Sequence, residues 1–341
     1  MDLRAVYLAT LERCAPETLV QVHVDTSMPR NVVAIGKCAG ALLDGVAAVH
    51  DIVRAFVAIP EGYRLPQTRA EVHAGGHPQV TRASFEAGRA LLEFVDAHDD
   101  ILFLVSGGGS ACVEVALESE EQLIETNARL VASGLPIGAI NAERRKLSAI
   151  KGGRLGASVR GRAITLVYSD VSSGRFEDVA SGPSLRDMRL IADNDTLTAT
   201  AAQVIGERAV RWDGQLECDV EDAARLLASR ALKSGEILVA GGEPTVVVRG
   251  DGRGGRCSEM AVRFAMRSEC EALFGSSDGV DGNSGCAGIH VRRRLEAGGP
   301  AGWKSALHHS DSFRVAAQVG EPIMIAPTGN NLRDLFLVAR D

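Results

Sequence analysis

The stretch ILFLVSGGGSACVE, residues 101–114, decides the fold class. An apolar run of strand length leads directly into Ser106, three glycines and Ser110. Glycine loses more backbone freedom on folding than any other residue, so three in succession are unfavourable unless the backbone must approach another group closely. The pattern therefore predicts a buried strand that ends in a ligand-binding loop.

Strand and helix patterns alternate around this stretch. Strands are predicted at 31–36, 53–60 and 162–170, and helices at 37–50, 81–98 (with Thr81 as N-cap) and within 119–150. Alternating strands and helices form parallel sheets covered by helices, and ligands bind at the carboxyl ends of their strands. We therefore predict an α/β fold whose larger domain is a Rossmann-like layered parallel sheet.

The second half of the chain has a different pattern. Residues 184–235 look helical, whereas 236–257 predict two β runs with glycine punctuation. A helix at 258–268, a Gly/Asp loop at 275–288 and two short strands at 321–329 and 335–340 follow. The change near 232–236 predicts an N-terminal domain at 1–233 and a smaller α/β domain at 234–341, with the active site in the cleft between them.

Composition narrows the function classes. The net charge of −7 argues against a general nucleic-acid or anionic-membrane surface, so an anionic ligand must be met by a local site. The seven cysteines include no C-x-x-C pair, which favours reduced thiols, a cytoplasmic location and no zinc site. No signal peptide or membrane span is predicted, and a homodimer is left open.

Four glycine clusters follow predicted strands. Exposed backbone N–H groups at such positions bind phosphate or carboxylate, although a single cluster is often only a tight turn. Because Lys37 and Arg256 accompany them, the set favours an anion site. The clusters are Gly36 with Lys37; Ser106, Gly107, Gly108, Gly109 and Ser110; Gly241, Gly242 and Glu243; and 252–256.

Standard nucleotide and hydrolase motifs do not match. Asn31 stands where a Walker A loop needs its first glycine, and Cys38 follows the lysine. No G-x-G-x-x-G opens a helix, which argues against a dinucleotide site. GSSDG at 275–279 has the spacing of a nucleophile elbow, but a loop follows it instead of a helix.

Individual polar residues allow two interpretations each. Lys37 begins a predicted helix, where the helix dipole disfavours a cation, so an anion ligand is favoured over a solvated lysine. Asp170 ends a strand and fits a general base, a Mg²⁺ ligand or a turn cap, and Asp178 follows it in the loop.

Other polar residues also allow two interpretations each. Arg256 could bind the oxygens of a phosphoryl group or could be a surface arginine. Asp278 and Asp281 could bind Mg²⁺ or cap turns, and for His77 a backbone contact is favoured over a ligand contact.

Taken in order, the motifs resemble the glycerate 2-kinase family of the MOFRL type. The resemblance covers most of the chain and is carried by VVAIGKCAG, HAGGHP, LFLVSGGGSA, INAERRKLSAIKGGRL, TLVYSDVSS, ASGPS, GGEPTVVVRGDGRGGR, SSDGVDGNSGCAG and APTGNNLRDL. It implies ATP- and Mg²⁺-dependent phosphorylation of the 2-hydroxyl of D-glycerate.

The resemblance also implies roles for particular residues. The essential lysine, aspartate and arginine fall on Lys37, Asp170 and Arg256. Nucleotide phosphates would contact 106–110 and 241–243. The substrate would contact Lys151, Ser258 and Asn330, and the metal Asp278 and Asp281.

Departures from the family pattern put the acceptor in doubt. Cys257 and Ser258 replace the usual Asn-Gln, and the ending APTGNN brings Ala326 and Asn330. A related sugar acid or biosynthetic hydroxy acid is an alternative acceptor. A nucleotide-dependent oxidoreductase or ligase and a non-catalytic ligand-binding relative are alternative functions. The missing dinucleotide motif and the retention of Lys37, Asp170 and Arg256 disfavour them.

Overall fold

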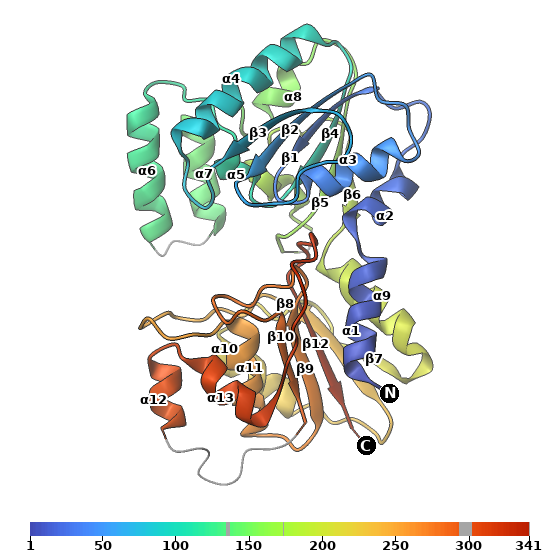
Figure 1. The fold of residues 1–341 in the computed structure, drawn as a ribbon, viewed down its shortest axis with the longest axis vertical. Coiled ribbons are helices and arrows are strands. Elements are labelled where there is room, and N and C mark those ends of the chain that lie inside the picture. The colour runs from blue at the N-terminus through green and yellow to red at the C-terminus, as the bar shows by residue number, and fades with distance from the viewer. Residues whose placement is uncertain (134–136, 173, 293–301, 341) are drawn as a thin grey trace. The chain divides into compact units, whose positions relative to one another are not determined.

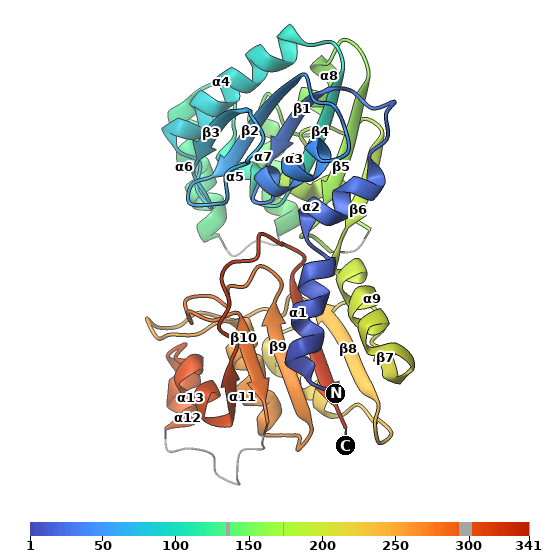
Figure 2. The same cartoon turned by 45° about the vertical axis from the view of Figure 1, so that its right-hand side comes forward.

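The computed structural model describes residues 1–133, 137–172, 174–292 and 302–340 and contains two compact units (Figures 1 and 2). One unit is Pro16–Asp193, and the other combines Met1–Ala15 with Asn194–Asp341. We call them the 16–193 unit and the 194–341 unit.

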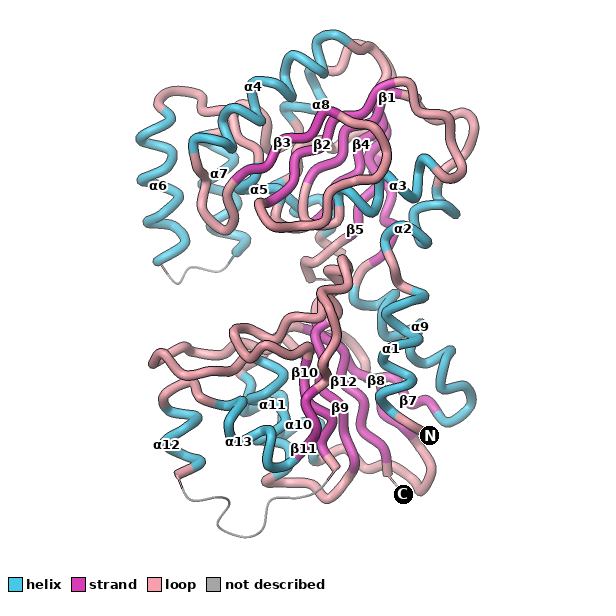
Figure 3. The backbone as a smooth tube through the Cα atoms, in the orientation of Figure 1, coloured by secondary structure: helices cyan, strands magenta, loops and turns pink. Residues whose placement is uncertain are grey.

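The 16–193 unit is built on a six-stranded parallel sheet of order β3-β2-β1-β4-β5-β6 (Figure 3). The strands are β1 (Asn31–Ile35), β2 (Arg54–Pro60), β3 (Glu71–Gly75), β4 (Ile101–Ser106), β5 (Ala163–Tyr168) and β6 (Met188–Ala192). The described helices are α2 (Pro16–Leu19), α3 (Ala39–Ala47), α4 (Arg82–Ala97), α5 (Gly109–Cys112), α6 (Glu120–Ala132), α7 (Ile137–Leu147) and α8 (Arg154–Ser158), with 3-10 turns at Val20–His23 and Phe176–Ser181.

Both faces of this sheet are covered, which explains the unbroken apolar runs in its central strands. Every residue of β4 and β5 is buried. Val33 and Ile35 of β1 pack with residues of α4 and α8 in one apolar cluster. The alternate residues of β1 face the opposite side of the sheet, and α3 contacts β1, β2 and β4. Thr81 caps α4, and its N–H donates to the Ser84 hydroxyl.

The 194–341 unit contains a second six-stranded sheet, of order β11-β10-β9-β12-β8-β7. Its strands are β7 (Ala209–Arg211), β8 (Ile237–Gly242), β9 (Glu271–Ser276), β10 (Gly288–Val291), β11 (Gly320–Pro322) and β12 (Asp334–Ala339). Only β7 and β8 pair in parallel, and the other neighbours are antiparallel. The described helices are α1 (Leu3–Arg13), α9 (Asn194–Ile205), α10 (Val220–Ala228), α11 (Arg256–Ala265), α12 (Trp303–His308) and α13 (Ser312–Val319), with a 3-10 turn at Gly206–Arg208.

Helices also lie on both faces of the second sheet. Residues of α10, α11 and α13 form one apolar core with β8, β9, β10 and β12. α1 and α9 lie together on the other side, as both views show (Figures 1 and 2), and α9 contacts β8. The first helix of the chain therefore belongs to the same unit as its last strand.

The α/β architecture and the four strands predicted in the first half, β1, β2, β4 and β5, are confirmed, whereas β3 was not predicted and the second half differs from the prediction. The units do not follow the predicted boundary at 233/234, because α1, α9 and α10 pack on the second sheet. Residues 184–235 contain β6 and β7, and β9 and β10 were not predicted. The β run predicted after Gly242 is not a strand and forms an isolated bridge from Thr245 to Asp219. The strand predicted at 321–329 is the short strand β11, Gly320–Pro322.

Among the described residues, no helix is both long enough and apolar enough to cross a membrane.

Candidate active site

Lys37 lies against the glycine-rich loop that follows β4. Its N–H donates to the carbonyl of Gly107 at 2.8 Å, and its side-chain stem borders Gly108. β1 and β4 are neighbouring parallel strands, so both segments emerge at the same edge of the sheet. Two of the predicted glycine clusters, Gly36 with Lys37 and the 106–110 loop, are therefore in contact. Its ammonium lies 5.8 Å from the centre of the Tyr63 ring and has no carboxylate partner in the part of the chain that the structure describes.

Two glycines explain why the sequence is so restricted here. Gly36 has a φ of +110°, and a Cβ there would lie 2.3 Å from the carbonyl oxygen of Ser106. Gly108 has a φ of +84°, a left-handed conformation that favours glycine. Gly36 lets the two loops lie backbone against backbone, whereas Gly108 lies against the side chains of Lys37 and Pro60. The three glycines predicted that the backbone approaches another group closely, and part of this close approach is between the two loops.

The two serines of the loop are engaged within the protein. The buried Ser106 hydroxyl donates to the carbonyl of Ile35 and accepts from the N–H of Cys38, which ties β4 to the loop of Lys37. The Ser110 hydroxyl lies 2.7 Å from that of Ser181, which in turn donates to Asn141 of α7. These hydrogen bonds hold the loop in place. The two serines could donate to a phosphate, as predicted, only if these hydrogen bonds changed.

Asp170 follows β5 at the same edge of the sheet. Tyr168, two residues earlier, pairs with Ser106, so Asp170 leaves the sheet beside the glycine loop. Its side chain is partly exposed. Asp178, farther along the loop, is buried and contacts Arg145 and Arg175. Burial opposes ionisation of Asp178, but the hydrogen bonds from both arginines outweigh it and hold its pKa below the usual value.

The Lys151 side chain is enclosed within the protein and does not face a ligand site. It is 1% exposed and forms an ion pair with Glu114, whose carboxylate also accepts from Ser148. Burial lowers the pKa of the Lys151 ammonium, and the charge of Glu114 opposes that shift. The predicted substrate contact of Lys151 is not supported by this placement, because its ammonium is enclosed.

Arg256, the first residue of α11, links the ends of two strands. Its Nε donates to Asp334 of β12 at 3.0 Å, and its Nη1 contacts Glu243, just after β8, at 2.8 Å. The Asp334 carboxylate, which is fully buried, raises the pKa of Arg256 above its usual value. The guanidinium is thus held in a fixed place while a third of its side chain remains exposed.

We expect Arg256→Ala to destabilise the protein by about 3–5 kcal/mol, because it leaves the buried Asp334 carboxylate without its cation. Arg256→Lys, which keeps a charge near Asp334, should lose less. Urea denaturation of the three proteins measures the difference. An alanine variant as stable as the wild type would show that Asp334 needs no counterion.

The Asp281 carboxylate binds the first turn of α11, including Ser258. The Asp281 carboxylate accepts from the N–H groups of Cys257 and Ser258 at 2.8 and 2.9 Å, and from the Ser258 hydroxyl. Both side chains are buried. The predicted metal role of Asp281 and substrate role of Ser258 are not supported by these contacts, because both carboxylate oxygens and the hydroxyl serve the helix.

Asp281 should also give the stability a distinct pH dependence. Burial raises its pKa to about 6, so the native chain takes up a proton that the unfolded chain does not bind until lower pH. This group's contribution therefore falls as pH rises, by about 1 kcal/mol between about pH 5 and about pH 7.5. Asp281→Asn removes the titration. Urea denaturation should show the wild type losing stability relative to the variant over that range, and a constant difference would contradict the assignment.

The remaining predicted residues belong to the same unit. Asp278 accepts from the Ser276 hydroxyl and the N–H of Val280 through one oxygen, which is a turn contact. The Asn330 amide donates to the carbonyl of Leu11, and its buried Oδ1 has no partner. Gly241 and Gly242 lie within β8, beside β12.

No group of three or more His, Cys, Asp or Glu that could hold a metal ion occurs among the described residues. Mg²⁺ bound to a nucleotide needs only one or two carboxylates in addition to phosphate oxygens. Asp278, whose second carboxylate oxygen accepts no hydrogen bond in the described part of the chain, and Asp170 fit that smaller requirement.

Sequence reasoning missed Asp334 and Glu114, the carboxylates that fix Arg256 and Lys151. It also missed Ser181, whose hydroxyl joins the glycine loop to α7. The signal for Ser181 appears only in the structure: Ala180, Ser181 and Gly182 have φ values of 52°, 61° and 65°. Such strain in non-glycine residues concentrates at functional sites.

Comparisons with known proteins agree with this arrangement. Residues 2–209 match the family described as "Domain of unknown function (DUF4147)", and residues 236–334 match the "MOFRL family". The chain is 28% identical to a D-glycerate 2-kinase of Thermotoga maritima over 96% of this chain and 93% of that protein. It is 27% identical to a protein of Agrobacterium vitis that is provisionally named a hydroxypyruvate reductase, over 98% and 92%.

A crystal structure of a glycerate kinase from Thermotoga maritima has a similar fold. The TM-score is 0.87 at 27% identity, with 99% of this chain and 98% of that chain covered. Both α/β units are therefore part of a fold that a glycerate kinase also has.

Proposed function

Since the chain belongs to the DUF4147 family and carries a MOFRL-family segment, we propose that it is an ATP-dependent kinase that phosphorylates the 2-hydroxyl of D-glycerate or a related small hydroxy acid. The name of the Thermotoga relative supports the substrate class. The observation that carries the proposal is the hydrogen bond from the N–H of Lys37 to the carbonyl of Gly107, at the carboxyl edge of a parallel sheet.

In the proposed reaction, two cations stabilise the transferred phosphoryl group. Lys37 has no carboxylate partner among the described residues, so its charge is available to an incoming phosphate. Arg256 keeps an exposed edge while Asp334 and Glu243 fix its orientation. Preorganised charges of this kind stabilise the transition state because they need not reorient during the reaction. The predicted cleft that would bring the two units' residues to one substrate stays a prediction.

Asp170 orients the acceptor hydroxyl and accepts its proton. The alcohol becomes more acidic as its oxygen bonds to phosphorus, so a carboxylate within hydrogen-bond reach can accept the proton late in the step. Mg²⁺, if held by the nucleotide phosphates and one carboxylate such as Asp170 or Asp278, would neutralise phosphate charge. Asp281 and Ser258 contribute indirectly because their hydrogen bonds hold the first turn of α11, and this helix begins at Arg256.

An ADP-release assay tests the activity. The purified chain should release ADP with Mg²⁺-ATP and D-glycerate, and ³¹P spectroscopy should place the phosphate on the 2-oxygen. A panel of L-glycerate and larger sugar acids would identify the acceptor if D-glycerate is poor. ATP binding without turnover on any acid would instead favour a non-catalytic relative.

A reductase is the second candidate, because of the name of the Agrobacterium relative. The same preparation should be tested for hydroxypyruvate-dependent oxidation of NADH and NADPH. We expect none, since no dinucleotide motif opens a helix in the sequence. Nicotinamide oxidation without ADP release would replace the kinase by the reductase.

A further inference from the structure

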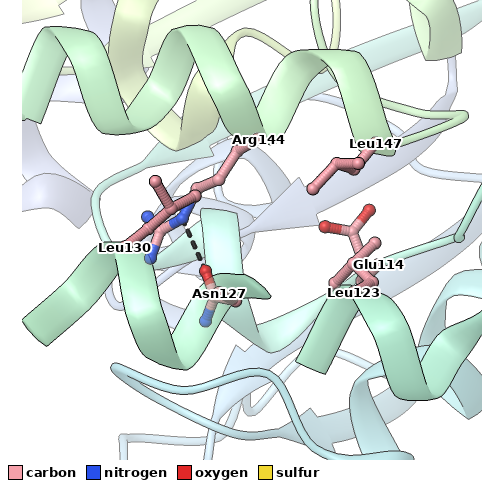
Figure 4. Close-up of a pocket in the computed structure, with 6 residues that line it drawn as sticks. All are labelled: Glu114, Leu123, Asn127, Leu130, Arg144 and Leu147. Carbon is pink, nitrogen blue, oxygen red and sulfur yellow. Dashed lines mark hydrogen bonds between the residues drawn. The ribbon is translucent and has the colours of Figure 1, made fainter. Parts of the chain in front are cut away.

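Arg144 of α7 lies partly buried between α6 and α7 (Figure 4). Its Nε donates to Oδ1 of Asn127 on α6 at 2.7 Å. This neutral amide is its only hydrogen-bonding partner in the part of the chain that the structure describes, and its outer nitrogens have no acceptor there. A guanidinium that is removed from water and lacks an anion is unfavourable, so an anionic partner should come from elsewhere.

The nearby carboxylate does not meet this need. Glu114 faces the same small cavity, but its charge is already matched by Lys151. The three groups Glu114, Lys151 and Arg144 together therefore carry one surplus positive charge. The adjacent Arg145 differs, because Asp178 neutralises it. Burial lowers the pKa of Arg144 while the Glu114 charge opposes the shift, as expected for a cation close to an acid but not paired with it.

The cavity itself is too small for a substrate. It has a volume of about 10 Å³, enough for one water molecule, and Leu123, Leu130 and Leu147 complete its wall. A ligand must therefore meet the outer nitrogens of Arg144 from outside the cavity. The cavity's wall and Asn127 would hold the guanidinium in one orientation.

The surroundings connect Arg144 with the loop of Lys37. The carbonyl of Ser84 accepts a hydrogen bond from the N–H of Glu114, and the Ser84 hydroxyl accepts one from the N–H of Gly76. Ser84 therefore joins the Arg144 cavity to the turn that contains His77. Desolvation, together with the positive charges of Lys37 and Arg144, lowers the pKa of His77 to about 4. His77 is thus uncharged at neutral pH and close to both cations.

We propose that Arg144 binds the carboxylate of the hydroxy-acid substrate and thereby selects acids over neutral alcohols. The inference rests on the proposed kinase function. A guanidinium held by one nitrogen presents its remaining N–H groups in a plane that matches the two oxygens of a carboxylate. Lys37 is a separate cation and stays available for phosphate.

The test compares Arg144→Gln with Lys146→Gln. Lys146 is exposed on the same helix and pairs with Glu143, so its variant removes the same charge without touching the proposed contact. Arg144→Gln should raise the KM for D-glycerate about 10- to 100-fold, as expected for loss of hydrogen bonds to a charged group. The KM for ATP should stay unchanged, and Lys146→Gln should match the wild type. Arg144→Lys should recover part of the loss.

A neutral substrate analogue separates recognition from damage to the fold. Glyceramide lacks the carboxylate charge, so Arg144→Gln should use it as well as the wild type does. Equal losses on glycerate and glyceramide would mean a structural role and overturn the proposal. So would a KM for glycerate within about twofold of wild type.

Calorimetric binding of D-glycerate distinguishes this inference from the kinase proposal. If the wild type binds glycerate and Arg144→Gln does not, carboxylate recognition holds even when turnover is absent. If the wild type phosphorylates glycerate and the variant binds it equally well, only the role of Arg144 is wrong. If the wild type neither binds nor phosphorylates any hydroxy acid, both proposals are wrong.

Discussion

We expect Lys37→Met to lower turnover about 10²- to 10³-fold, while the KM for the acid should change little. Methionine keeps the length and the apolar stem that borders Gly108, so the variant removes chiefly the charge. The expected size follows from measured losses of a single preorganised group that stabilises transition-state charge. Steady-state kinetics with saturating Mg²⁺-ATP measure the effect, because a group that acts only in the transition state lowers kcat and kcat/KM together.

Lys146→Met is the matched control, since it removes an exposed lysine of the same unit. The corresponding change at Arg256 would be harder to interpret, because Arg256 also balances the buried Asp334. A Lys37→Met enzyme within about threefold of wild type, with the fold intact by circular dichroism, would remove Lys37 from the mechanism.

Strands β1, β2, β4 and β5 of the 16–193 unit could be predicted because they are buried on both faces, whereas β3 and β6 are partly exposed and were missed. Fully apolar runs such as 101–106 have few alternatives, and neighbouring parallel strands end at one edge. The contact between Lys37 and the glycine loop follows from these two facts.

The other unit was harder to predict because β7, β10 and β11 are only three or four residues long. Conversely, the β-branched run containing Val247 and Val248 has strand propensity, yet both side chains are exposed and none of the described strands pairs with it. Propensity describes fit to a pleated surface, and no such surface is available there.

Roles that depend on distant partners could not be predicted either. Asp281 is 23 residues from Ser258, and Lys151 is 37 residues from Glu114. The sequence shows a carboxylate in a turn and a lysine near glycines, and both patterns suit ligand binding. Only the fold reveals that each group is already satisfied inside the protein.

Asp170→Asn should lower turnover about 10²- to 10⁴-fold, the range of a general acid–base contribution. Asparagine keeps the shape of the side chain but cannot accept a proton. Asp96→Asn, on the exposed side of α4, is the control for loss of a carboxylate. Turnover is measured at fixed ATP while Mg²⁺ is varied.

The Mg²⁺ dependence decides between the two roles of Asp170. A lost base lowers turnover at every Mg²⁺ concentration and leaves the half-saturating concentration nearly unchanged. A lost metal ligand raises that concentration, and excess Mg²⁺ then restores part of the activity, because nucleotide phosphates still supply most of the ligands. We favour the base, since Asp170 follows β5 beside the glycine loop, where a carboxylate can reach a substrate hydroxyl. Rescue of Asp170→Asn by excess Mg²⁺ would refute that choice and make Asp170 a metal residue.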